Sequence, residues 1–117
     1  MIAGIGFSSA CTEDELAGLL AGTVIDVLAT PAAKAAHPLV TGMAARLGAR
    51  VQAISAESLA QVQARCPTRS ARALRETGIA SVAEGCALAA AGPGGRLVRS
   101  RIASRHATCA LAEGALP

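Results

Sequence analysis

The first residues along the chain that could form a binding site are two closely spaced glycines. Gly4 and Gly6 end a short apolar segment, and Ser8 and Ser9 follow in the next few positions. Glycines between a strand and a helix allow backbone N–H groups to approach an anion at the helix N-terminus. Because Ser9 stands where a dinucleotide fingerprint has its third glycine, the pattern is only a fragment of that fingerprint. The segment is either an anion-binding loop or a tight structural turn, and no complete nucleotide site is expected.

A group of arginines near the end of the chain could bind carboxylates. It consists of Arg96, Arg99, Arg101 and Arg105. Alternate residues of a strand share one face, so Arg99 and Arg101 could present a fork of guanidinium groups to a polycarboxylate ligand. A charged edge strand that resists aggregation explains the same pattern equally well. The sequence leaves both explanations open.

Ser81 and Glu84 could be read as a nucleophile and its base, but their spacing is that of a capping box. In a capping box the hydroxyl accepts a hydrogen bond from the third helical N–H, and the glutamate reaches back to the cap. Thr12 and Glu15 have the same spacing. We therefore predict that a helix begins at each of these two positions.

The histidines and cysteines give no metal-binding pattern. His37 and His106 are the only histidines, and no Cys-x-x-Cys occurs among Cys11, Cys66, Cys86 and Cys109. We expect no metal and no cofactor, and we expect Cys86 and Cys109 to pack as small apolar side chains. A serine or cysteine with His106 could form a nucleophilic pair, because Ser104 and Cys109 are close in sequence. The spacing does not single out either of them.

These residues must be positioned by alternating strands and helices. Short apolar segments predict strands at 2–6, 24–29, 50–54, 96–102 and 107–111, with Thr30 and Pro31 stopping the second strand. Caps and terminal glycines predict helices from 12 to about 21 and at 39–47, 56–64, 70–77 and 82–91. This order predicts an α/β fold: a three-layer α/β/α sandwich around a mixed sheet of about five strands, whose last two strands form an antiparallel pair.

Composition limits the possible classes of protein. The chain has 117 residues, enough for one domain, which we place at 1–113 with a loose tail at 114–117. Its hydrophobic content of 52% excludes disorder of the highly charged kind. Charged residues interrupt every apolar run that could span a membrane, and no signal peptide pattern is present, so we expect a cytoplasmic protein with reduced thiols. The net charge is only +3 and Phe7 is the single aromatic residue, which argues against nucleic-acid binding.

Several segments together match one known family in order along the chain. They are Gly4-Ile-Gly6, Leu28-Ala29-Thr30 with Lys34 after it, Ile54-Ser-Ala-Glu-Ser-Leu59, Glu76-Thr-Gly78, Ser81-Val-Ala-Glu84, Ala91-Gly92 and Thr108-Cys-Ala-Leu-Ala112. This ordered set resembles the cobalamin-biosynthesis CobE family, which is similar to the C-terminal domain of CbiG. The similarity spans nearly the whole chain. It implies a three-layer α/β/α domain that acts in construction of the corrin ring.

The resemblance implies an accessory protein that binds a carboxylated corrin precursor or delivers it between enzymes of the pathway. A modestly basic cleft with backbone donors would suit such a ligand. The residues expected to bind it are Gly4, Gly6, Ser8, Ser9, Thr30, Lys34, Ser81, Glu84, Arg99 and Arg101.

Two alternatives accompany this hypothesis. CbiG proteins are associated with opening a lactone ring on a cobalt-precorrin intermediate, so the chain could be a small hydrolase-like enzyme acting on a precorrin. That function would place His106 close to Ser104 or Cys109 in a concave pocket. The other alternative is a structural partner subunit of a pathway enzyme, with the basic strand as its interface.

Overall fold

The computed structural model describes residues 1–115 of the chain, and strands and helices alternate through most of it. The expected tail at 114–117 therefore lies partly outside the described residues. The elements are β1 Ile2–Phe7, α1 Glu13–Leu20, β2 Val27–Pro31, η1 Ala32–Lys34, α2 Pro38–Leu47, β3 Arg50–Ile54, α3 Ala56–Gln61, η2 Gln63–Arg65, α4 Ala71–Thr77, α5 Val82–Ala91, β4 Arg96–Ala103 and β5 Ala107–Glu113.

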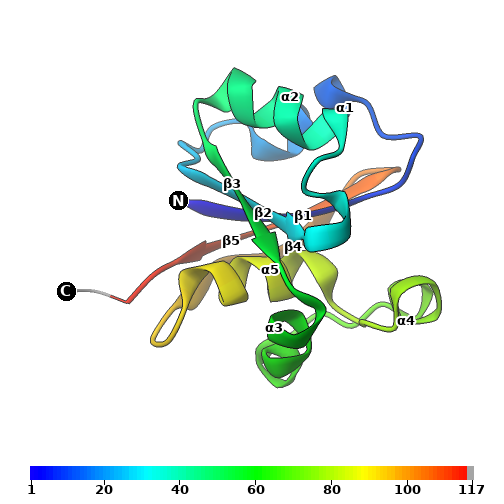
Figure 1. Ribbon diagram of the computed structural model, residues 1–117, viewed down its shortest axis with the longest axis vertical. Helices are drawn as coiled ribbons and strands as arrows, with labels where there is room; N and C mark the ends of the chain where they lie inside the picture. Colours follow the sequence, from blue (N-terminus) through cyan, green and yellow to red (C-terminus); the bar gives the residue numbers. More distant parts are fainter. Residues whose placement is uncertain (116–117) are drawn as a thin grey trace.

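The strands form one five-stranded mixed sheet in the order β3-β2-β1-β5-β4. The pairs β1–β2 and β2–β3 are parallel, whereas β5 is antiparallel to both β1 and β4. Helices α1 and α2 cover one face of the sheet, and α5 and α3 lie on the other (Figure 1). The three-layer sandwich and the final antiparallel pair predicted from the sequence are confirmed.

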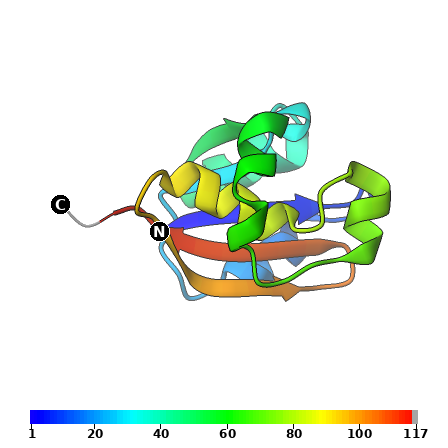
Figure 2. The same ribbon diagram turned by 90° about the horizontal axis from the view of Figure 1, so that it is seen from below.

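The two faces of β1 pack in different ways. Ala3, Ile5 and Phe7 join the core beneath α1 and α2. On the other face Gly4 lies directly under α5, where an added Cβ would stand 2.0 Å from the carbonyl oxygen of Ala83. The absence of a side chain at Gly4 thus lets α5 cross close above the sheet, as Figure 2 shows from below. Because β1 covers Ile2–Phe7, the strand predicted at 2–6 is confirmed, and the alternative in which Gly4 and Gly6 belong to a loop or tight turn is wrong.

The second strand begins later than the sequence predicts. The apolar run at 24–29 suggested the strand, but β2 begins at Val27. Val24 is 82% exposed, and Ile25 lies in the loop before the strand with its side chain buried in the core. Thr30 and Pro31, expected to stop the strand, are its last two residues and align with residues of β3. Pairing with β1 and β3 sets these bounds, and a hydrophobic pattern does not report pairing.

The cysteines and helices agree with most expectations. All four cysteines are free, and burial raises the pKa of Cys86 to about 12 and that of Cys109 to about 11. These two thiols are buried among apolar side chains, as predicted.

Helix α3 ends at Gln61, earlier than expected. No helix within residues 1–115 is long and apolar enough to cross a membrane.

Helix α4 stands apart from the two helical layers (Figures 1 and 2). None of its residues is buried. The segment is held at its start, where the Ser70 amide donates to the carbonyl of Ala80 at 2.7 Å and the Ser70 hydroxyl accepts from the Ala73 amide at 3.1 Å. An exposed helix anchored in this way forms an outer wall without adding to the core.

Candidate functional site

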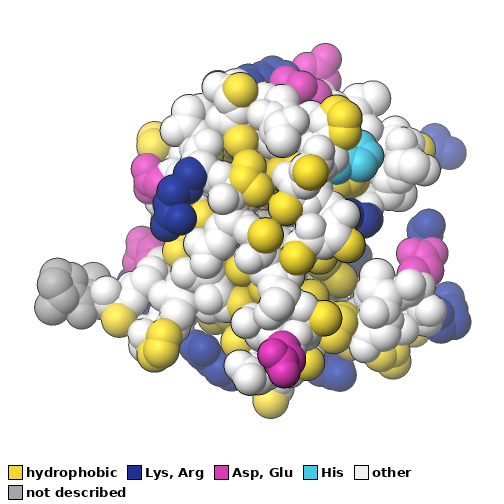
Figure 3. Space-filling model, in the orientation of Figure 1, with side chains coloured by type: hydrophobic (Ala, Val, Ile, Leu, Met, Phe, Trp, Pro, Cys, Tyr) yellow, Lys and Arg dark blue, Asp and Glu magenta, His cyan; other side chains and the backbone are white. Residues whose placement is uncertain are grey.

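A cleft of about 680 Å³ opens at the carboxyl ends of β1, β2 and β3. Its walls are the loop after β1, η1, the start of α3, α4 and the turn between β4 and β5. Open α/β sheets bind ligands outside the carboxyl ends of their strands. In Figure 3 the hollow lies between α4 and the rest of the molecule, with basic side chains at its margin.

The floor of the cleft is apolar. It includes Ile54, Leu59, Ile79 and Val82. Gly6 also lines it, and an added Cβ there would lie 2.9 Å from the hydroxyl of Thr108 and 3.5 Å from Val82. The glycine therefore keeps a space open between β5 and the start of α5.

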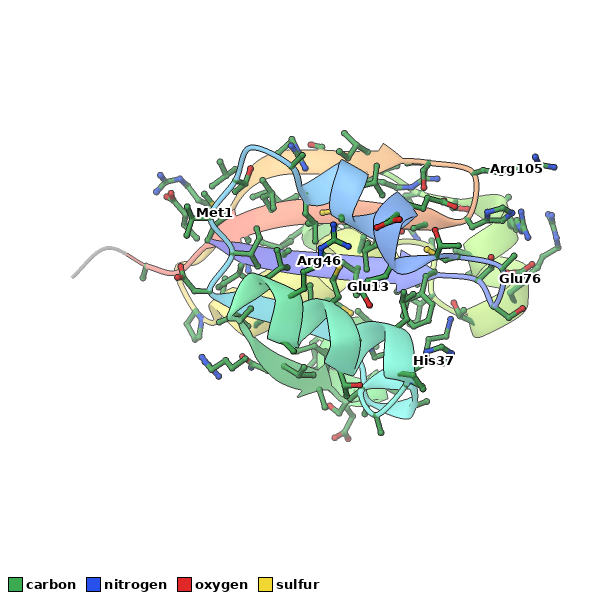
Figure 4. All side chains as sticks on the ribbon, turned by 90° about the horizontal axis from the view of Figure 1, so that it is seen from above. Met1, Glu13, His37, Arg46, Glu76 and Arg105 are labelled. Atoms are coloured by element: carbon green, nitrogen blue, oxygen red, sulfur yellow. The ribbon has the colours of Figure 1, made fainter. Side chains whose placement is uncertain are left out.

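The rim of the cleft is basic. It carries Lys34, Arg72, Arg101 and Arg105. Glu76 is the only acidic residue in its described lining, and its carboxylate pairs with Arg72 at 3.0 Å on the same helix. Figure 4 shows Arg105 and Glu76 at the same end of the molecule, on the β4–β5 turn and on α4. The rim thus has a surplus of positive charge.

Lys34 is fixed in position above the end of β1. Its ammonium donates to the carbonyl of Phe7 at 2.5 Å and lies 4.6 Å from the centre of the Phe7 ring. The same ring meets His37 edge-on, with centroids 5.1 Å apart. Because His37 Nδ1 accepts from the first turn of α2, the rim cation is supported by contacts that extend into that helix.

Glu15 joins the first turn of α1 to the β4–β5 turn. Its Oε2 accepts from the Ser104 hydroxyl and from the His106 amide at 2.7 Å, while Oε1 lies 2.9 Å from His106 Nδ1. The hydrogen bonds from Ser104 and His106 lower the pKa of Glu15 to about 2. The Thr12 hydroxyl accepts from the Glu15 amide as predicted. The Glu15 carboxylate, however, binds Ser104 and His106 and does not accept from the Thr12 amide as a capping box would require.

A hydrolase was expected to bring His106 close to Ser104 or Cys109 in a pocket, and the structure does so only in part. Ser104 and His106 both line the cleft. The Ser104 hydroxyl donates to Glu15, however, and makes no hydrogen bond to the imidazole among residues 1–115. Cys109 is fully buried in the core beneath α1 and α2, so its expected proximity to His106 in a pocket is wrong.

Ser81 and Glu84 form a buried network beneath the cleft. Glu84 is fully buried; its Oε1 accepts from the Thr68 amide and the Ser81 hydroxyl, each at 2.9 Å, and its Oε2 accepts from the Arg101 amide at 3.0 Å. Burial raises the pKa of this carboxyl, but the three hydrogen bonds outweigh burial and hold the pKa below its ordinary value. Helix α5 begins after Ser81 as predicted, but the Ser81 hydroxyl donates to the Glu84 carboxylate and accepts from no helix amide, so the hydrogen bonds expected of the second capping box are wrong.

Arg99 and Arg101 do not form the expected fork. The register of β4 against β5 shifts between Leu97 and Arg99 and again between Arg99 and Ile102, and such bulges break the alternation of faces. Arg99 turns to the α1 side and donates to the carbonyl of Leu19 at 3.1 Å, near the end of that helix. Arg101 lines the cleft instead.

Comparison with known proteins identifies the family. The family model for the cobalamin synthesis G C-terminus matches residues 1–112. The chain belongs to this family. No curated protein gives a significant match in sequence. The resemblance to CobE and to the C-terminal domain of CbiG is confirmed, and membership places the chain in cobalamin biosynthesis.

Solved structures agree with the family assignment. The crystal structure of CobE, a protein from the cobalamin (vitamin B12) biosynthetic pathway, is 35% identical with a TM-score of 0.86, covering 95% of this chain and 87% of that one. The cobalamin biosynthesis protein chiG from Agrobacterium tumefaciens is 34% identical with a TM-score of 0.71, covering 97% of each chain. A putative cobalamin biosynthesis protein G homolog from Sulfolobus solfataricus shares the fold at 22% identity and a TM-score of 0.70, covering 95% of this chain and 35% of that one.

The cleft of this family member brings together some of the residues singled out in its sequence. Four expected ligand-binding residues line it: Gly6, Ser8, Lys34 and Arg101. Six lie outside its lining: Gly4, Ser9, Thr30, Ser81, Glu84 and Arg99. Thr30 is fully buried in β2, and its hydroxyl has no hydrogen-bond partner among the described residues.

Sequence reasoning missed the contribution of α4. Arg72, Ala73, Glu76 and Thr77 line the cleft together. Their spacing places them on one helical face, so the grouping was visible in the sequence. Arg72 was not among the expected site residues, because the sequence of a single helix does not show which of its sides overhangs a cleft.

Proposed function

We propose that the chain binds a carboxylated corrin-ring precursor in the cleft and holds or delivers it for enzymes of cobalamin biosynthesis. One observation carries the proposal: an apolar floor formed by side chains such as Ile54 and Val82 lies inside a basic rim. A corrin precursor has the complementary chemistry, since its ring system is apolar and its periphery carries many carboxylates. The ring would cover the floor, and the carboxylates would meet the rim.

The ammonium of Lys34 and the backbone of Arg101 are positioned before any ligand arrives. Lys34 is held by the carbonyl and the ring of Phe7, and the backbone of Arg101 is held by Glu84. Groups fixed in this way lose little conformational entropy when they bind, so more of each contact contributes to affinity. A hydrogen bond to a charged group contributes about 1.5–3 kcal/mol when it is shielded, and much less at an exposed rim.

The dimensions of the site support the same ligand class. A cleft of about 680 Å³ lies within the range of about 300–1,000 Å³ that is usual for small-molecule sites. Because α4 has no buried residue, small movements of this wall would cost little packing energy. Delivery requires release as well as binding, and an exposed wall is compatible with both.

The test is a titration of the chain with hydrogenobyrinic acid, followed by absorbance, with its neutral heptamethyl ester as the matched ligand. The acid should bind, its affinity should fall as salt rises, and the ester should bind far more weakly. Arg72→Ala should weaken binding, whereas Arg75→Ala, the same charge change on an exposed position of α4 outside the cleft lining, should not. Equal binding of acid and ester at every salt concentration would refute the role of the rim.

Hydrolysis is a second candidate function, favoured by one observation. Glu15 holds His106 in the wall of the cleft, where an imidazole could activate water. Incubation with a lactone-bearing precorrin, analysed by mass spectrometry, separates the two functions. A carrier returns its ligand unchanged, whereas a hydrolase adds one molecule of water to it and loses that activity on His106→Gln.

A further inference from the structure

His106 offers one ring nitrogen to the cleft. Its Nδ1 lies 2.9 Å from Oε1 of Glu15, and the other oxygen of this carboxylate already accepts from the Ser104 hydroxyl and the His106 amide, so the carboxylate serves His106 as an acceptor. Nδ1 therefore carries the proton, and in the neutral ring the lone pair lies on Nε2. No described residue hydrogen-bonds Nε2, and the side chain is 32% exposed in the cleft wall.

A free metal ion would not be retained by this nitrogen. Zinc and similar ions take four or more ligands in proteins, and residues 1–115 contain no group of three or more His, Cys, Asp or Glu side chains that could hold one. The basic rim, with Lys34 and Arg105, would also repel a free cation. One imidazole is sufficient only where the remaining ligands arrive with the metal, as the equatorial nitrogens of a macrocycle do.

The contact with Glu15 is of the kind that supports a metal ligand. Metal-binding imidazoles usually donate their other N–H to a carboxylate, which fixes the ring orientation and raises its basicity. The same carboxylate also accepts from the His106 amide at 2.7 Å, so backbone and ring are held together. The same part of the wall also carries the small residues Ala103 and Ala107.

We propose that Nε2 of His106 is an axial ligand to the cobalt of a cobalt-bearing corrinoid in the cleft, with Glu15 as its positioning residue. The inference rests on the proposed function, because the corrin supplies the equatorial ligands. The bond formed is cobalt to Nε2, and the bond broken is cobalt to an axial water. No electron is transferred, and His106 keeps the proton on Nδ1.

The test uses two probes that share a macrocycle and its carboxylates, diaquacobyrinic acid with cobalt and hydrogenobyrinic acid without metal. With the cobalt probe, wild type should shift the absorbance bands as the axial water is replaced. After reduction to cobalt(II), electron paramagnetic resonance should show triplet splitting from an axial ¹⁴N. Protein labelled with ¹⁵N-histidine should convert each triplet to a doublet. Glu15→Gln should lower the affinity for the cobalt probe by about 10- to 100-fold.

His106→Gln and His106→Ala should lose the splitting and still bind the metal-free probe, and free imidazole should restore the splitting in His106→Ala. His37→Gln is the imidazole control, because His37 lies outside the cleft lining; it should keep the nitrogen splitting, whatever it does to affinity through its contact with the Phe7 ring. Binding of both probes without a nitrogen signal would overturn the axial ligand and leave the proposed function standing. A signal that survives both His106 variants would also overturn it. If neither probe binds, the proposed function fails as well.

Discussion

Glu84 lies beneath Arg101 and accepts a hydrogen bond of 3.0 Å from its backbone amide. The contact spans 17 positions and joins α5 to the edge strand β4. The carboxylate also accepts from the Thr68 amide in the segment that leads to α4. One buried acid therefore fixes two walls of the cleft without lining it.

Replacing Glu84 with glutamine should destabilise the fold. The amide would turn one NH₂ group toward donors that now meet a carboxylate oxygen, so at least one buried donor would lose its acceptor. We expect a loss of about 1–3 kcal/mol in the free energy of unfolding, measured by urea denaturation. Glu76→Gln, on the exposed helix α4, is the control and should cost less than about 0.5 kcal/mol. Equal losses in the two variants would contradict the structural role of Glu84.

Glu15 should make stability depend on acid pH. Its pKa is lowered from 4.5 to about 2 by the hydrogen bonds from Ser104 and His106, so the folded state favours the ionised form. This contribution is fully present above pH 4.5 and is lost as the pH falls toward 2. Urea midpoints across that window should fall more steeply for wild type than for Glu15→Gln. A control substitution of the exposed Glu57 should keep the wild-type slope; parallel curves for Glu15→Gln and wild type would contradict the contact.

Gly4 should tolerate no side chain. An added Cβ would stand 2.0 Å from the Ala83 carbonyl and 2.5 Å from the Ala87 amide, and neither backbone atom can move without shifting α5. Gly4→Ala should therefore cost about 1–3 kcal/mol or more in the free energy of unfolding. Gly18→Ala is the matched control, because its Cβ meets nothing within 4 Å and alanine favours a helix by about 0.5–1 kcal/mol. Thermal unfolding of both variants checks the contrast, and a stable Gly4→Ala protein would contradict the close packing of α5.

The sequence predicted the layers well because helix caps and apolar runs are local signals. The αL glycine Gly48, for example, ends α2 where the sequence placed its stop. Prediction from sequence failed where the pairing of strands decides which way a side chain points. The bulges that place Arg99 and Arg101 on different sides arise from the pairing of β4 with β5. Ser81 has the spacing of a cap, yet burial beside the Glu84 carboxylate changes the partner of its hydroxyl. The cleft residues of α4 were missed for the same reason, since only tertiary structure shows that Arg72 overhangs a pocket.

The two arginines of β4 allow the most direct test of corrin binding in the cleft. Calorimetric titration with hydrogenobyrinic acid should be carried out on wild type, Arg101→Ala, Arg101→Lys and Arg99→Ala, each confirmed as folded. Arg101→Ala should weaken binding by about 1.5–3 kcal/mol if the contact is shielded from water. Arg101→Lys should recover only part of this, because lysine lacks the planar fork.

Arg99→Ala should bind as wild type does, since its guanidinium contacts Leu19 on the far side of the sheet from the cleft. Loss of the hydrogen bond from Arg99 to the Leu19 carbonyl should instead lower the free energy of unfolding. The predicted result is therefore weakened binding for Arg101→Ala and unchanged binding for Arg99→Ala. Absence of binding by wild type, or an equal loss in both variants, would contradict the assignment of the corrin precursor to this cleft.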